Sequence, residues 1–101
     1  MTIASAASGF TTLLAPLLLC LSGCAAAPVQ EMSDARQAIG AARAAGAEER
    51  APEQLKAASD LLTAAEQALL GYRYREARMQ AEKALREAQA ALEAANVARQ
   101  N

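Results

Sequence analysis

The side chains that could do chemistry in this sequence are two cysteine thiols, a few hydroxyls and 11 carboxylates, and there is no histidine. Because histidine is the commonest general base, its absence removes most nucleophile–base pairs. Two cysteines without histidine also fall short of the usual zinc clusters, and there is no glycine-rich phosphate loop. The carboxylates are interpreted as a solvated surface. The sequence therefore predicts a protein that is not an enzyme and has neither a metal site nor a cofactor.

Cys24 is the thiol with an informative context. It ends the tetrapeptide Leu21-Ser22-Gly23-Cys24, which follows an apolar run over residues 10–21. This run is too short for a membrane span of ~20 residues, and it fits the ~7–15-residue core of a secretory signal peptide. The tetrapeptide resembles the bacterial lipobox, where a peptidase cleaves before the cysteine and lipid is attached to its thiol and α-amine. The alternatives are a plain secretory signal and a short helical anchor in which the cysteine is incidental.

The lipobox interpretation makes residues 1–23 a signal peptide and residues 24–31 a lipid-anchored tether. Cys20 is then removed with the signal and Cys24 is consumed by lipid, so no disulfide is expected. Several acyl chains, at ~0.8 kcal/mol per buried CH₂, anchor a protein effectively permanently. The next residue is Ala25 rather than aspartate. By resemblance to Gram-negative lipoproteins, this predicts delivery to the periplasmic face of the outer membrane.

Helical patterning dominates the chain after residue 31. Apolar residues from Met32 to Ala42 recur at spacings of 3 and 4, which predicts a helix that ends before Gly46. Two adjacent apolar stripes predict a second helix over about residues 48–70, with Pro52 in its first turn. A third helix is expected over residues 73–99, on an unbroken seam of Tyr74, Ala77, Ala81, Ala84, Ala88, Ala91, Ala95 and Ala98.

Short connections between these helices make sequential helices antiparallel neighbours. We therefore expect an all-α domain over residues 32–99, either an up-down-up three-helix bundle or an extended helical hairpin with a third helix. Alanine seams allow close helix packing but bury little area, and chains this small have little margin of stability. We therefore expect the folded domain to have modest stability, or to gain stability from self-association or from a partner.

Two family resemblances follow from these residues. The Gly71–Leu85 segment resembles the turn and second helix of a tetratricopeptide repeat, but only one helix pair is present and no function is implied. Nearly all of the chain after the lipobox is similar to the domain-of-unknown-function family 4398 (DUF4398), which comprises small alanine-rich bacterial lipoproteins. The residues that carry this resemblance are Met32–Ile39, Ala51–Glu53, Glu66–Ala68 and Tyr74–Ala84. The resemblance implies a lipoprotein signal followed by alanine-rich helices, and it implies no activity.

Two surfaces are candidates for contacts. The first is the turn at Gly71, which would face the membrane with Tyr72, Tyr74, Arg73, Arg75 and Arg78. The alternative is that this basic turn is solvated and that Tyr74 packs inward. The second surface is an apolar strip where the third helix outruns the second, and it includes Leu85, Leu92, Ala95 and Ala98. A frayed helix end is the alternative there.

The formal net charge of −1 lacks the basic excess of a nucleic-acid binder. The sequence favours a lipid-anchored envelope protein that acts as a structural or adaptor module, with a protein partner or self-association. A peptidoglycan-associated spacer and a chaperone-like binder of envelope proteins are the alternatives. Residues 98–101 contain no lysine, which disfavours a spacer linked covalently to the cell wall.

Overall fold

The computed structural model describes residues 27–101, and these residues are almost entirely helical. The helices are α2 (Val29–Ala44), α3 (Ala47–Arg50), α4 (Pro52–Leu70) and α5 (Tyr74–Gln100). Within this described range there is no strand, so the prediction of an all-α fold is confirmed. No helix in the same range is long and apolar enough to cross a membrane. The predicted signal peptide and the predicted lipobox lie outside the described residues.

The connection between the first two long helices differs from the sequence prediction. Gly46 adopts the left-handed conformation (φ 86°) after α2, as expected for a residue that follows a helix end. The next residues do not open one long helix. They form the four-residue helix α3, and the chain then leaves the helical conformation at Ala51 (φ −145°, ψ 54°) before Pro52 starts α4. The reason is Pro52, because a proline disfavours the helical conformation of the residue before it.

The connection between α4 and α5 is a tight turn with the hydrogen bonds of a Schellman motif. The backbone N–H of Tyr72 donates to the carbonyl of Leu69 (3.0 Å), and that of Arg73 donates to the carbonyl of Ala68 (2.9 Å). Gly71 caps α4 at φ −89°, and the left-handed residue is Tyr72, at φ 59°. The turn therefore places a tyrosine at the position that usually holds glycine.

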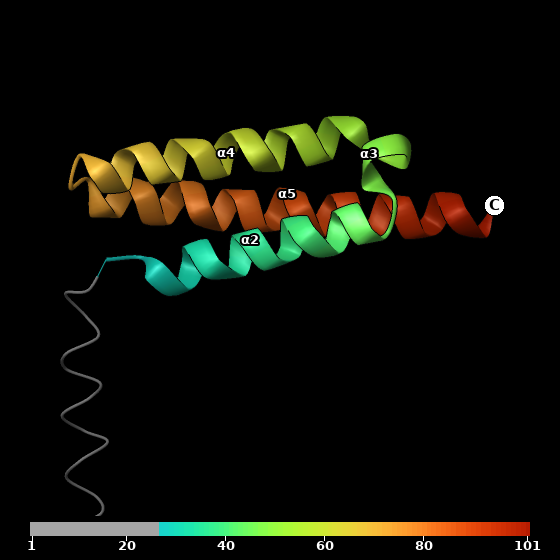
Figure 1. Cartoon of the computed structure of the whole chain (residues 1–101), viewed down its shortest axis with the longest axis horizontal. Coiled ribbons are helices and arrows are strands. Elements are labelled where there is room, and N and C mark those ends of the chain that lie inside the picture. The colour runs from blue at the N-terminus through green and yellow to red at the C-terminus, as the bar shows by residue number, and fades with distance from the viewer. Residues whose placement is uncertain (1–26) are drawn as a thin grey trace, which may run out of the picture.

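The three long helices lie side by side and alternate in direction (Figure 1). α5 is the central element, because it contacts both α2 and α4 extensively, whereas α2 and α4 contact each other much less. Figure 1 shows the start of α2 and the α4–α5 turn at one end of the molecule, and α3 and Asn101 toward the other. An ion pair between Glu31 and Arg78 (3.3 Å) links the start of α2 to the first turns of α5. The chain segment that leads back to residue 24 thus leaves from the end that carries the α4–α5 turn.

The interior is built mainly of alanine. Its large side chains are Pro28, Met32, Ile39 and Leu55, and the other buried apolar residues are alanines that are at most 3% exposed. The alanine seam of α5 is buried as predicted from Ala77 to Ala95, whereas its two ends, Tyr74 and Ala98, are exposed. Methyl groups at this seam let the helix axes approach closely, and the resulting core is thin.

Candidate functional site

The predicted lipidation site lies just ahead of the described residues. Leu21, Ser22, Gly23 and Cys24 fall outside them, and the described chain begins at Ala27. Only three peptide units separate Cys24 from Ala27, and at ~3.5 Å per residue they span at most ~10 Å. A lipid on Cys24 would therefore hold this end of the helical domain close to a bilayer.

The α4–α5 connection presents apolar and aromatic side chains to solvent, and we call residues 70–75 the tyrosine turn. Leu70 and Tyr72 are each 80% exposed, and Tyr74 is 37% exposed. The two rings meet edge to face with their centroids 6.3 Å apart. Tyr74 therefore lies against Tyr72 at the surface and is not packed into the core.

Charge around the tyrosine turn is mixed but has no acid within it. Residues 67–75 contain Arg73 and Arg75 and no carboxylate. The guanidinium of Arg73 pairs with Glu76 one helical turn away (3.3 Å), and both side chains are about half exposed. Arg78 is separated from this group, because it pairs with Glu31 of α2. Of the three arginines predicted at the turn, Arg73 and Arg75 lie there, whereas Arg78 forms an ion pair between α5 and α2.

The predicted partner face on α5 needs a correction. Ala95 is fully buried and Leu92 packs against the same core cluster, while Leu85 is half-buried. The physical reason is α3. Its Ala47 belongs to the same core cluster and covers a part of α5 that a comparison of helix lengths predicts to be uncovered. The expected overhang near Leu92 and Ala95 is therefore wrong, and only the last turn or so of α5 extends past its neighbours.

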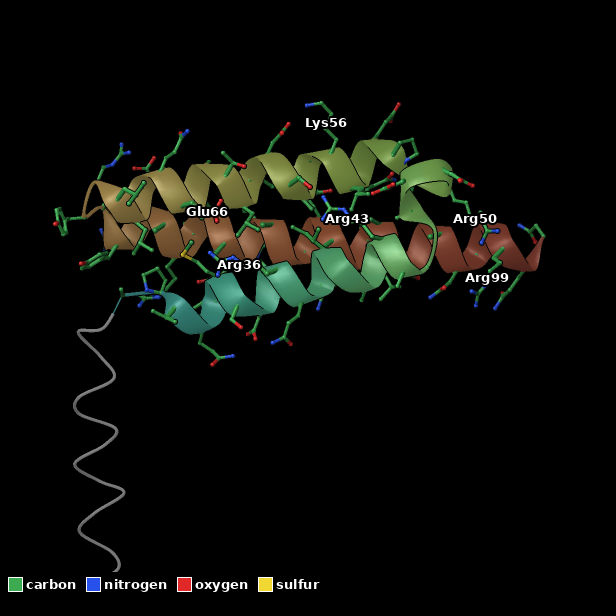
Figure 2. The ribbon with its side chains drawn as sticks, viewed as in Figure 1. Arg36, Arg43, Arg50, Lys56, Glu66 and Arg99 are labelled. Atoms are coloured by element: carbon green, nitrogen blue, oxygen red, sulfur yellow. The ribbon has the colours of Figure 1, made fainter. Side chains whose placement is uncertain are left out.

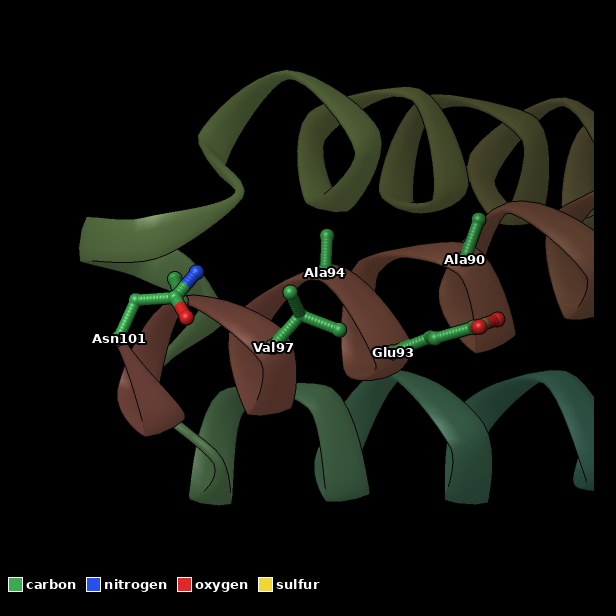
Figure 3. A pocket seen from close by; sticks show the side chains of 6 residues that line it. Ala90, Glu93, Ala94, Val97 and Asn101 are labelled. Carbon is green, nitrogen blue, oxygen red and sulfur yellow. The ribbon is translucent and has the colours of Figure 1, made fainter.

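A different row of side chains on the last turns of α5 is exposed except at Ala94, which is partly buried against the core cluster, and we call this row the α5 strip. It is an open, shallow groove without a side chain from another helix, seen from close by in Figure 3. Val97 is 52% exposed. The strip is formed by Ala90, Glu93, Ala94, Val97, Ala98 and Asn101. Ala90, Ala94 and Val97 have the spacing of one helix face, so this strip is visible in the sequence, but the neighbouring buried alanine seam has the longer and more regular pattern.

The rest of the polar surface includes solvated ion pairs, and Figure 2 shows the side chains of several of their members. Arg36 of α2 pairs with Glu66 of α4 at 3.2 Å. On α4, the ammonium of Lys56 donates a hydrogen bond to Asp60 (2.8 Å), and this bond raises the pKa of Lys56 above its ordinary value. Within residues 27–101, no group of three histidine, cysteine or acidic side chains is placed to hold a metal ion.

Comparison with known proteins gives one match. A family model described as "Domain of unknown function (DUF4398)" matches residues 30–101, which include all of α4 and α5 and almost all of α2. No curated protein and no solved structure matches the chain. These comparisons thus indicate no role for the tyrosine turn or the α5 strip, and the roles of both surfaces follow from their own residues.

Proposed function

The chain belongs to the DUF4398 family, whose description assigns no function, and we propose from its own residues that it is a lipid-anchored cell-envelope protein. In this proposal Cys24 carries the lipid, and the helical domain is a structural or adaptor module for another protein at the periplasmic face of the outer membrane. The lipobox residues support the anchor, and Ala25 supports the outer membrane.

The observation that carries the adaptor role is the α5 strip. Small side chains on an exposed helix face allow a second helix to approach within the lower part of the ~8–10 Å range. The strip lies toward the end of the domain remote from the α4–α5 turn, so it is accessible to a partner when the other end is tethered (Figure 1). Glu93 at its edge favours a basic residue on the partner. We propose that the occupant is an amphipathic helix of a partner protein with a basic flank.

Site-specific photo-cross-linking in cells tests this role. A photo-reactive amino acid at position 97 should give one adduct of defined mass, and the same probe at position 86, which is exposed on the polar part of α5, should give none. Val97→Glu should weaken the complex by about 2 kcal/mol, because it removes roughly one buried aliphatic side chain from the interface.

Other outcomes identify the alternatives. An adduct of twice the chain's mass indicates self-association through the strip. Sedimentation with peptidoglycan that Val97→Glu does not change, without an adduct, supports the non-covalent spacer. A broad series of adducts at both positions supports a chaperone-like binder of envelope proteins.

A further inference from the structure

Large apolar side chains exposed to solvent gather at one end of the molecule. Val29 is 67% exposed at the start of α2, and the tyrosine turn adds Leu70, Tyr72 and Tyr74. At the other end, the large exposed apolar side chain is Val97. Contiguous apolar groups on a small soluble surface mark an interaction site. The distribution in the described part of the chain therefore singles out the end that carries the tyrosine turn.

The backbone of the turn fixes the direction of these side chains. The two hydrogen bonds of the Schellman motif hold Tyr72 in a left-handed conformation that non-glycine residues rarely adopt. Gly71, the adjacent residue, has an ordinary negative φ. The tyrosine thus occupies the tip of the turn at an energetic cost, and its ring is 80% exposed rather than buried.

The chemistry of the turn matches the headgroup region of a bilayer. Tyrosine rings prefer the membrane–water interface, where the apolar ring is buried and the hydroxyl remains hydrated. Arg73 and Arg75 alternate with the two tyrosines in the sequence. The segment from residue 67 to residue 75 has no carboxylate, and the half-exposed Glu76 just beyond it pairs with Arg73 (3.3 Å). Arginine near an anionic lipid surface is attracted to it. A protein partner would also accept apolar groups, but the next observation favours the membrane.

The tyrosine turn lies at the end from which the chain leads to Cys24. Met32 of α2 packs with Ala65 and Ala81 near this end, and Glu31 pairs with Arg78. Figure 1 shows the start of α2 and the α4–α5 turn at the same end of the molecule. A lipid on Cys24 therefore brings the turn to the bilayer without a change in the fold.

We propose that the tyrosine turn rests in the headgroup region of a bilayer that contains anionic phospholipids, with Leu70 and Tyr72 inserted and Arg73 and Arg75 at the phosphates. The lipid anchor and the turn are then two contacts that hold the helices upright. α5 spans about 40 Å at ~1.5 Å per residue, so the α5 strip stands well away from the membrane. This inference rests on the proposed lipid anchor at Cys24.

Fluorescence quenching by brominated lipids tests the inference in the anchored protein. The chain has no tryptophan, so Tyr72→Trp introduces a single reporter at the turn. Glu49→Trp gives the matched reporter in α3, at the opposite end. Each full-length protein is expressed in cells, purified from membranes in its mature form, and reconstituted into vesicles of zwitterionic and anionic phospholipid with bromine on the acyl chains. We expect strong quenching of the reporter at position 72 and none at position 49.

A charge reversal tests whether Arg73 and Arg75 hold the tyrosine turn in the headgroup region or whether the lipid anchor alone keeps the turn near the bilayer. Arg73→Glu with Arg75→Glu should reduce quenching of the reporter at position 72, more strongly at low than at high salt. Arg50→Glu with Arg99→Glu makes the same charge change at the far end and should leave quenching unchanged. Circular dichroism of each variant verifies that the helices are intact.

The two proposals can fail separately. The mass of the purified protein reports whether Cys24 is acylated. If it is not, residues 24–101, in which Cys24 is the single thiol, are produced without the preceding segment and coupled through Cys24 to a maleimide phospholipid, and the quenching experiment is repeated. Equal quenching at positions 72 and 49, or none at position 72 in vesicles that carry the protein, overturns the membrane-facing turn in either case.

Discussion

At the scale of single residues, Tyr72 has a backbone conformation that lowers the stability of the fold. It is the non-glycine residue with a positive φ in residues 27–101. A left-handed conformation costs a residue with a Cβ roughly 1–2 kcal/mol. The side chain is 80% exposed, so little burial offsets this cost. Strain of this kind persists where it serves a function, which agrees with a role of the ring outside the folded core.

Replacement of Tyr72 by two small residues measures this strain. Both Tyr72→Gly and Tyr72→Ala remove the ring and its contact with Tyr74, but only glycine relieves the left-handed conformation. We expect Tyr72→Gly to be more stable than Tyr72→Ala by about 1 kcal/mol in urea unfolding, since glycine's larger entropy in the unfolded chain offsets part of the relief. Equal stabilities of the two variants would show that the turn is not strained.

At the scale of elements, α5 organises the fold through a seam of methyl groups. Ala81, Ala84, Ala88 and Ala91 have no exposed surface, and α2 and α4 pack on either side of them. α2 contributes Met32 and Ile39, and α4 contributes Leu55, so each flanking helix has few large side chains in the core. The ion pairs Arg36–Glu66 and Glu31–Arg78 join α2 to its neighbours, but exposed pairs add only ~0–1 kcal/mol each.

Ala88→Leu and Ala90→Leu form a matched pair on the same helix. Ala88 is fully buried in the core cluster, and Ala90 is exposed two residues away. A leucine at position 88 forces the helices apart and should cost about 1–3 kcal/mol or more, whereas a leucine at position 90 should change stability by less than ~0.5 kcal/mol. Thermal unfolding followed by circular dichroism gives both values. Similar melting temperatures for the two variants would contradict the close packing of this seam.

At the scale of the whole molecule, the two ends differ in chemistry. One end carries the start of α2 and the tyrosine turn, and the other carries α3, Arg50, Arg99 and Asn101 (Figures 1 and 2). In the proposed envelope location, the first end faces lipid and the second faces the periplasm. Because the reach from Cys24 to Ala27 is short, a lipid on Cys24 would be the main determinant of which end faces the membrane.

Substitution of the two cysteines tests the anchor in cells. Cys24→Ala should abolish labelling by radioactive palmitate and leave the protein soluble or unprocessed, because the thiol that accepts lipid is lost. Cys20→Ala should change neither labelling nor membrane fractionation, since Cys20 lies in the expected signal peptide. Palmitate labelling that persists in Cys24→Ala would refute the lipobox interpretation. Loss of labelling in both variants would show that Cys20 is also required, against the expectation for this position.

The positions of the long helices and their buried faces could be predicted from the sequence. Met32, Ala35, Ile39 and Ala42 were expected on one face of the first helix, and all of them are buried. The central seam of α5 was expected and is buried as well. Helical periodicity and the preference of glycine for helix ends are local properties, so a single sequence is enough to reveal them.

Other features depended on more than helical periodicity. The break at Ala51, the burial of Ala95 beside Ala47, and the choice of Tyr72 as the left-handed residue were not evident from periodicity. The break at Ala51 follows from Pro52, and the left-handed Tyr72 follows from the hydrogen bonds of its turn. The burial of Ala95, by contrast, is decided by how α3 packs against α5. The sequence by itself thus determined an alanine-rich helical domain behind a lipobox. Only the tertiary structure decided which apolar side chains remain exposed, because burial depends on the packing partner and not on the residue alone.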